Sequence, residues 1–165
     1  MVTTPSTASA PDLTFGWEKL SDLLADGVEA LTKAHWREIA MDQKDVPLDV
    51  DWDQLLAEER AKRYRVFVAR RGGKIAGYLP LMFFNPSRYQ STLFVQDDTV
   101  YVVPEERNRF AVWLGLFDRA IAELPRPCKL QIRLRPQHGG ERIGAILDKR
   151  YGTRLTELVH TVVLK

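Results

Sequence analysis

Residues 92–124, TLFVQDDTVYVVPEERNRFAVWLGLFDRAIAEL, hold the pattern that decides the fold. The first part, residues 92–103, is rich in β-branched and aromatic side chains and predicts a strand that Pro104 ends. Apolar residues then recur at three- and four-residue spacing and predict one helix over residues 105–124. The residues of this apolar stripe are Phe110, Trp113, Leu114, Phe117, Ile121 and Leu124. A helix that follows a strand directly is typical of a crossover to a parallel strand.

Five further elements are predicted on the N-terminal side of this stretch. They are a strand over residues 14–20, helices over 21–39 and 52–62, and a hairpin whose strands span 64–70 and 74–84. Ser21 and Asp51 are suitable N-caps for the two helices. Pro80 lacks a backbone N–H, so it predicts a bulge or an edge position in the second hairpin strand.

The C-terminal side predicts a strand over residues 128–135, a helix over 140–149 and a last strand over 155–164. The strand CKLQIRLR alternates strictly, with Lys129, Gln131, Arg133 and Arg135 on one face. A cationic face of this kind indicates a cleft that binds anions, such as the phosphates of a cofactor or of nucleic acid. The alternative is an exposed sheet face that pairs with acidic residues.

The order of elements predicts a layered α/β (α+β) fold, with a mostly antiparallel sheet that turns parallel where a helix crosses over. With 165 residues, the chain has the length of one domain, which we place at residues 13–165 after a disordered leader over residues 1–12. The net charge of +2 excludes a strongly basic nucleic-acid binder but allows a local patch. No apolar stretch approaches the roughly 20 residues that span a bilayer, so we expect no membrane partner.

Cysteine and histidine usage narrows the chemistry further. Cys128 is alone, which excludes an intrachain disulfide and favours a reducing, cytoplasmic setting. The three histidines show no metal-ligand spacing, so we expect no metal site.

Several short motifs resemble the GNAT acyltransferase superfamily. YVVPEERNRF at residues 101–110 is similar to the strand–turn–helix motif of that family, commonly V-x-P-E-x-R-G-x-G-x-G. HWREIA at residues 35–40, GY at 77–78 and the D-x-x-Y-V-x-P-E-x-R run at 98–107 resemble a phage and prophage branch of small GNAT-like proteins. The resemblance covers about residues 20–165. It implies a mixed sheet with helices on both faces and a splayed pair of parallel strands, between which acyl-CoA binds.

The resemblance also assigns a donor site. It implies that the backbone of Val102 and Val103 binds pantetheine, and that the N-terminus of the following helix binds the CoA pyrophosphate. The residues assigned to this pyrophosphate cradle are Arg107, Asn108, Arg109, Phe110, Ala111 and Val112. Asn108, Phe110 and Val112 stand where the family usually has glycine or alanine. Phe110 either lines a changed cradle or simply opens the apolar stripe of the helix.

The same resemblance implies catalytic candidates. Gln96 stands where many family members carry a glutamate base, and Asp98 lies on the same strand face. We therefore expect Asp98 to be the base, buried and with a raised pKa, or else to hold the loop over residues 85–91. Asp97, on the opposite face, is expected to be a solvent or loop partner and the second choice of base. Asp148 and Tyr151 are the candidates for the acid that the family places near the end of the next helix.

Acceptor contacts are expected from His35, Glu38, Tyr89, Arg133 and Arg135. For His35 the alternative is a core histidine, and for Glu38 a surface charge on the helix. The implied function is acetyl transfer from acetyl-CoA to an amine of a small molecule or a macromolecule. The alternatives are a GNAT-fold enzyme that modifies a nucleobase in DNA, and a binding module without catalysis. Either a monomer or a homodimer is compatible with the sequence.

Overall fold

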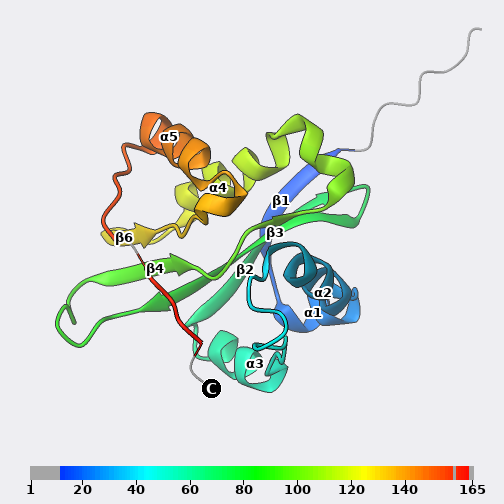
Figure 1. The fold of residues 1–165 in the computed structure, drawn as a ribbon, viewed down its shortest axis with the longest axis horizontal. Coiled ribbons are helices and arrows are strands. Elements are labelled where there is room, and N and C mark those ends of the chain that lie inside the picture. Colours follow the sequence, from blue (N-terminus) through cyan, green and yellow to red (C-terminus); the bar gives the residue numbers. More distant parts are fainter. Residues whose placement is uncertain (1–11, 158, 164–165) are drawn as a thin grey trace, which may run out of the picture.

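A computed structural model describes residues 12–157 and 159–163 (Figure 1). The N-terminal half contains β1 (Leu13–Glu18), α1 (Leu20–Ala25), α2 (Val28–Ile39), α3 (Trp52–Arg60), β2 (Tyr64–Arg71) and β3 (Lys74–Phe84). The C-terminal half contains β4 (Leu93–Asp97), β5 (Tyr101–Val102), the 3₁₀ helix η1 (Pro104–Arg109), α4 (Ala111–Glu123), β6 (Cys128–Gln131), the 3₁₀ helix η2 (Pro136–His138) and α5 (Gly140–Tyr151). None of the helices in these described residues is both long enough and apolar enough to cross a membrane.

The strands form one sheet in the order β1-β2-β3-β4-β6, and β5 pairs with β3 beyond the end of β4. All pairs are antiparallel except β4 with β6, which run parallel on either side of the α4 crossover. Helices α1, α2 and α3 cover one face of the sheet, and α4 covers the other (Figure 1). The prediction of a layered α/β fold with a mostly antiparallel sheet is therefore confirmed.

Each face of the sheet buries its own apolar cluster, because successive side chains of a strand point to opposite faces. Phe67 and Leu79 pack with Phe117 beneath α4. Val68 and Tyr78, each one position away, pack with Leu23 beneath α1 and α2. This alternation fixes the register of the β2–β3 hairpin, whose turn at residues 72–73 the sequence predicts correctly.

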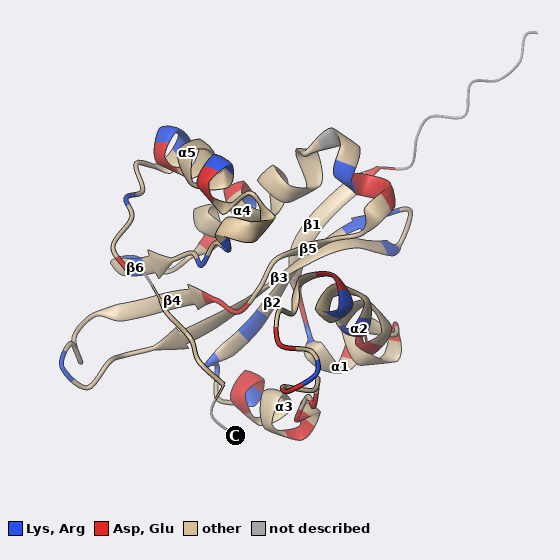
Figure 2. Cartoon of the chain, viewed as in Figure 1, with Lys and Arg blue, Asp and Glu red and all other residues tan. Residues whose placement is uncertain are grey.

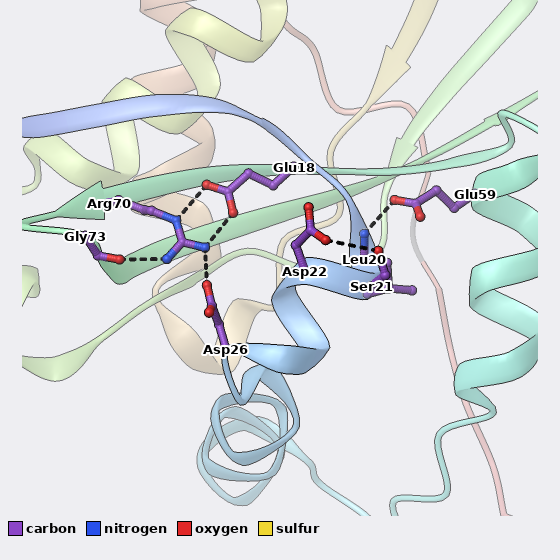
Figure 3. Close-up of polar contacts among 8 residues, drawn as sticks. All are labelled: Glu18, Leu20, Ser21, Asp22, Asp26, Glu59, Arg70 and Gly73. Carbon is purple, nitrogen blue, oxygen red and sulfur yellow. Dashed lines mark hydrogen bonds and ion pairs between the residues drawn. The ribbon is translucent and has the colours of Figure 1, made fainter.

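The prediction of one helix over residues 21–39 is wrong, because α1 and α2 are separate. Gly27 between them has φ +82, a left-handed conformation that glycine adopts without strain. Ser21 is not the N-cap of α1; it lies inside the helix and donates to Asp22 (Figure 3). The backbone N–H of Leu20 instead donates to a Glu59 carboxylate oxygen at 2.7 Å, so α3 caps α1 from outside. Asp51 does cap α3, as predicted, by accepting from Gln54 N–H at 2.8 Å.

Arg70 ties this helical layer to the edge of the sheet (Figure 3). Its guanidinium donates to both carboxylate oxygens of Glu18 at 2.7 and 2.6 Å and to Asp26 at 2.6 Å. A fourth bond reaches the carbonyl of Gly73 at 2.7 Å. The Arg70 side chain is 21% exposed, so this fork holds the α1–α2 break against β1 and β2 more firmly than a surface ion pair does.

The strand predicted over residues 92–103 is divided by a β-bulge. β4 pairs with β3 through Asp97 opposite Leu81, and β5 pairs with it through Tyr101 opposite Tyr78. Three residues, 98–100, therefore face two, 79–80, and this excess of one residue bends the strand. Pro80 lies at this change of partner, inside the sheet and not at its edge. Its carbonyl accepts from Asp98 N–H at 3.0 Å, and its missing N–H faces the bulge, where no ladder bond is required.

The helix predicted over residues 105–124 begins later than expected. Residues 104–109 form η1, Phe110 has φ +48, and only then does α4 begin. Downstream, the helix expected over residues 140–149 is confirmed as α5. The strand expected over residues 128–135 is shorter, since β6 ends at Gln131. Among the described residues of the range 155–164 there is no strand, and Leu155 and Val159 are each 80% exposed there.

Candidate functional site

The parallel pair β4–β6 separates at one end and forms a wedge. Its pairing runs from Leu93 opposite Cys128 to Gln96 opposite Gln131 and stops there. Beyond this point the bulge leads the chain into β5, which pairs with β3 and not with residues 132–135. The splayed pair of parallel strands is thus present.

Asp97 closes the narrow end of this wedge. Its carboxylate accepts the backbone N–H of Arg133 at 2.8 Å, in place of the next bond of the ladder. The Arg133 guanidinium returns to the carbonyls of Asp97 at 2.6 Å and Asp98 at 3.1 Å. Asp97 is 1% exposed, and burial raises its pKa to about 6, which the Arg133 N–H only partly opposes. One buried carboxylate therefore fixes both strands where they part.

The wide end of the wedge holds a cavity with a volume of about 410 Å³. Its walls come from the C-terminal part of α2, β5, η1, the start of α4 and the η2–α5 region. Tyr101 and Val102 line it from β5, and Phe110 and Trp113 line it from the start of α4. The cavity thus lies between a strand backbone and a helix N-terminus.

Phe110 shapes this helix N-terminus. It is the N-cap of α4, its φ of +48 and ψ of −7 are left-handed, and its side chain caps no N–H group. The first helical bond runs from Leu114 N–H to the Phe110 carbonyl at 3.0 Å, so the N–H groups of the first turn have no partner within the helix. The Phe110 ring stacks on Trp113 with centroids 5.0 Å apart. Phe110 therefore has the backbone conformation that glycine favours, and it adds an aromatic ring to the cavity wall.

Two arginines, one from each side of the wedge, bind the end of α2. Arg107 donates to both carboxylate oxygens of Glu38 at 2.8 and 3.1 Å, and Arg135 donates to the carbonyl of Ile39 at 2.9 Å. Arg107 Nε also donates to the Val102 carbonyl at 2.8 Å, the group that the sequence resemblance assigns to pantetheine. The Arg107–Glu38 pair, with side chains 41% and 39% exposed, therefore occupies part of the expected donor groove.

A smaller cavity of about 170 Å³ lies on the other side of the bulge. Asp98 and Thr99 line this cavity, whereas Val100 lines the larger one. His35 borders both cavities and packs on Tyr101 with ring centroids 4.8 Å apart. Burial lowers the pKa of His35 to about 4, and Glu38 opposes this only in part, so the imidazole is neutral at pH 7.

The two adjacent aspartates at the end of β4, coloured red in Figure 2, differ from the sequence-based expectation. Asp98 is not buried: its side chain is 49% exposed, and its ion-pair partner is Arg133 at 3.7 Å rather than the loop over residues 85–91. Asp97, expected to be a solvent or loop partner, is the buried one. Strand alternation indicates that Asp97 is the buried aspartate, because it shares a strand face with Val95, which is 0% exposed. Asp98 nevertheless remains the carboxylate that lines the smaller cavity.

Three of the remaining candidates, Asp148, Tyr151 and Tyr89, line neither cavity. Tyr151, whose hydroxyl donates to Asp118 at 2.5 Å, and Asp148, which accepts from Thr153, lie outside both cavities. Tyr89 is 59% exposed and stacks on Phe94 in the β3–β4 region, also outside both. In the part of the chain that the structure describes, Tyr101 is the tyrosine that lines the larger cavity.

The cradle residues other than Phe110 and Arg107 are spread around the start of α4. Asn108 is exposed on η1, and the side chain of Arg109 lies outside the described residues. Ala111 and Val112 form the first turn of α4, with Val112 buried. Val103 N–H is engaged by the Ala76 carbonyl at 3.0 Å. Within the described ranges, no three His, Cys, Asp or Glu side chains gather in a group that could hold a metal ion.

Solved acetyltransferase structures share this fold. No family model matches the chain, and no curated protein matches it. A GCN5-related N-acetyltransferase from Ralstonia eutropha superposes with a TM-score of 0.68 at 18% identity, covering 92% of this chain and 99% of the other. An aminoglycoside acetyltransferase from an uncultured soil metagenomic sample, in complex with sisomicin, gives 0.64 at 12% identity, covering 93% and 97%.

A third structure, a predicted acetyltransferase from Clostridium acetobutylicum with acetyl-CoA, has a TM-score of 0.58 at 14% identity, covering 92% of this chain and 96% of the other. These likenesses show that the chain has the fold of the GNAT acetyltransferases.

Proposed function

We propose that this protein is an acyl-CoA-dependent N-acyltransferase, which transfers an acetyl group from acetyl-CoA to an amine. The observation that carries the proposal is the wedge, which opens in front of the uncapped N-terminus of α4. A helix N-terminus offers free N–H groups and a partial positive charge, and it therefore suits a pyrophosphate. β5 borders the same cavity and pairs only with β3 within the described sheet, so its other edge suits the amide groups of pantetheine.

The residues present fit the donor in one respect and must move in another. The left-handed backbone at Phe110 leaves the N–H groups of Ala111 and Val112 available to a phosphate. Pantetheine, by contrast, needs the Val102 carbonyl that Arg107 occupies. Binding of the donor therefore requires Arg107 to leave this carbonyl, after which its guanidinium is free to pair with a phosphate.

The chemistry follows from the bulge, which separates the two cavities. The amine lone pair attacks the thioester carbon, the C–S bond breaks, and the CoA thiolate leaves. Backbone N–H groups at the wedge polarise the carbonyl oxygen. Asp98, on the side of the smaller cavity, takes the proton of the amine directly or through a water molecule. A thiol has a pKa of about 8.5, so the thiolate needs little assistance, and Tyr101, whose pKa burial raises, retains a proton that it can donate.

The finer resemblance, to the phage and prophage branch, is part of this proposal. Its motif segments at residues 35–40, 77–78 and 98–107 are distant in sequence, yet all three border the two cavities. At Gly77 a Cβ would lie 2.7 Å from the Tyr101 carbonyl, so the close approach of β3 to β5 requires glycine. We expect the enzyme to act in the cytoplasm, on a small-molecule or macromolecular amine, as a monomer or a homodimer.

One alternative is favoured by a specific observation. The Arg107–Glu38 pair and the Phe110 ring occupy space that the donor needs, as expected for a binding module without catalysis. The DNA-modifying alternative stays a prediction, and the contacts argue against it. Arg133 and Arg135, its expected backbone contacts, already donate to protein carbonyls.

Release of free thiol from acetyl-CoA in the presence of a panel of amines tests the proposal. We expect turnover by the wild type and a loss of about 100-fold in kcat for Asp98→Asn, which keeps the shape but not the proton acceptor. Asp53→Asn, at an exposed aspartate on α3 that lines neither cavity, is the matched control and should turn over normally. Absence of thiol release with every amine, from a protein that does bind its partner, would instead support the binding module.

A further inference from the structure

The smaller cavity has an unusual combination of an apolar wall and one acidic group. Its apolar wall comes from α1, the start of α2, α3 and the strands beneath, with Leu20, Leu23, Val28 and Leu55 among its residues. Asp98 is its only carboxylate, and no Lys or Arg lines it in the described part of the chain. Arg133 reaches Asp98 from the β6 side, at 3.7 Å. The cavity therefore favours a ligand that is mostly apolar and carries one positive charge.

A buried hydroxyl without a hydrogen-bond partner also points to a ligand. Tyr78 is 4% exposed, lines this cavity, and its hydroxyl makes no hydrogen bond in the described structure. Burial raises the pKa of Tyr78 to about 12, and the Thr32 side chain opposes this only in part, so the hydroxyl stays protonated. Nearly all buried polar groups have a partner, and one without any is costly. The Asp98 carboxylate lines the same cavity as this hydroxyl.

The size of the cavity limits the ligand. Its volume is about 170 Å³, and an apolar protein cavity of roughly 150 Å³ holds a benzene molecule. His35, at the boundary with the larger cavity, is neutral at pH 7 and does not repel a cation. A ligand with several ammonium groups would leave all but one of them unpaired in an apolar environment.

We propose that the acceptor is a small primary amine with a single ammonium group on an apolar body the size of one aromatic ring. This inference rests on the proposed function, because the bulge places the smaller cavity opposite the donor side. The apolar body packs between α1 and α3. The ammonium group donates to the Asp98 carboxylate and the Tyr78 oxygen, next to residues 98–100, across which the thioester lies.

Calorimetric binding of three probes to the full chain without acetyl-CoA tests this proposal. The probes are 2-phenylethylamine, 2-phenylethanol as a neutral analogue of equal size, and kanamycin as a polycation. We expect 2-phenylethylamine to bind at least tenfold more tightly than either of the others. The alcohol has no charge to pair with Asp98, and kanamycin would leave its further ammonium groups unpaired in an apolar environment. Tyr78→Phe should weaken its binding about fivefold, and Asp98→Asn about tenfold.

A matched pair of variants locates the binding. Leu55→Trp fills the cavity from α3, whereas Leu56→Trp adds the same ring at the next position, which does not line the cavity. We expect Leu55→Trp to abolish binding of 2-phenylethylamine and Leu56→Trp to retain it, with thermal unfolding confirming that both fold. Equal binding by both variants, tighter binding of kanamycin, or no binding of 2-phenylethylamine to the wild type would overturn the proposal.

The same samples titrated with acetyl-CoA separate the two claims. If acetyl-CoA binds but 2-phenylethylamine does not, the acceptor assignment fails while the proposed acyl transfer stands. Binding of 2-phenylethylamine with the specificity above, from a protein that does not bind acetyl-CoA, supports the amine site and refutes the acyl transfer.

Discussion

Replacing Phe110 by glycine and by alanine tests the shape of the helix start that the donor needs. The wild-type φ of +48 lies in the left-handed region, which costs a residue with a Cβ about 1–2 kcal/mol. Glycine removes this strain, whereas alanine retains it. Both variants lose the stacking on Trp113, which contributes about 0.5–1.5 kcal/mol. Glycine also makes the unfolded chain more flexible, at a cost of about 0.5–1 kcal/mol.

These contributions predict different stabilities for the two variants. In Phe110→Gly the relief of strain roughly offsets the other two losses, so its free energy of unfolding should lie within about 1 kcal/mol of the wild type. Phe110→Ala keeps the strain and loses the ring, and it should be less stable than Phe110→Gly by about 1 kcal/mol. Inside an ordinary helix the order is reversed, since alanine is favoured over glycine there by about 1 kcal/mol.

Urea denaturation of the three proteins, with a shared m-value, measures these differences. If Phe110→Ala is as stable as Phe110→Gly or more so, the backbone at residue 110 is not left-handed, and the argument for an open helix N-terminus is refuted. Acetyl-CoA affinity should follow a related order. Phe110→Gly, which lets the backbone approach a phosphate most closely, should bind at least as tightly as the wild type.

Three other predictions follow from buried groups and close contacts. Burial raises the Asp97 pKa from 3.8 to about 6, so between these values the folded protein binds a proton that the unfolded chain has lost. The stability of the wild type relative to Asp97→Asn, measured by denaturation at each pH, should therefore fall by about 2 kcal/mol as pH rises from 4 to 7. A flat difference would refute the burial argument. The low pKa of His35, about 4, predicts an NMR titration midpoint well below the ordinary 6.5. The contribution of the neutral imidazole to the free energy of unfolding should be lost as pH falls from about 7 to 4. A midpoint near 6.5 would contradict this. A Cβ at Gly115 on α4 would lie 2.3 Å from the Phe15 ring on β1, whereas one at Gly144 would make an ordinary contact at 3.6 Å. Gly115→Ala should therefore destabilise the protein by about 1–3 kcal/mol, and Gly144→Ala should stabilise it by about 0.5–1 kcal/mol. Equal shifts in thermal unfolding would show that α4 does not pack on β1 at this point.

Local sequence patterns predicted the elements of the fold that one local physical cause determines. The diglycine turn and its β-branched flanks determine the β2–β3 hairpin. The apolar stripe of residues 110–124, with prolines after it, determines the crossover helix and so the parallel β4–β6 pair. The short motifs also led to the correct fold, because residues 77–78 and 98–107 shape the contact of β3 with β5.

Features that depend on distant partners were not predictable in this way. The cap of α1 comes from Glu59, 39 residues away, so Ser21 was a misleading local signal. The bulge at residues 98–100 depends on Pro80 in the neighbouring strand. The sequence of residues 92–103 alone therefore predicted one continuous strand. Alternation alone would have placed Asp97 on the face of the buried Val95. Its bond to Arg133, 36 residues away, has no local signature.

The central claim is that the wedge in front of α4 binds an acyl-CoA. Calorimetric titration of the wild type with acetyl-CoA, and with S-acetylpantetheine as the analogue that lacks the pyrophosphate, tests it most directly. We predict micromolar binding of acetyl-CoA and binding of S-acetylpantetheine at least tenfold weaker, because only the former reaches the N–H groups of the α4 N-terminus. Absence of acetyl-CoA binding to both the wild type and Phe110→Gly would contradict the account.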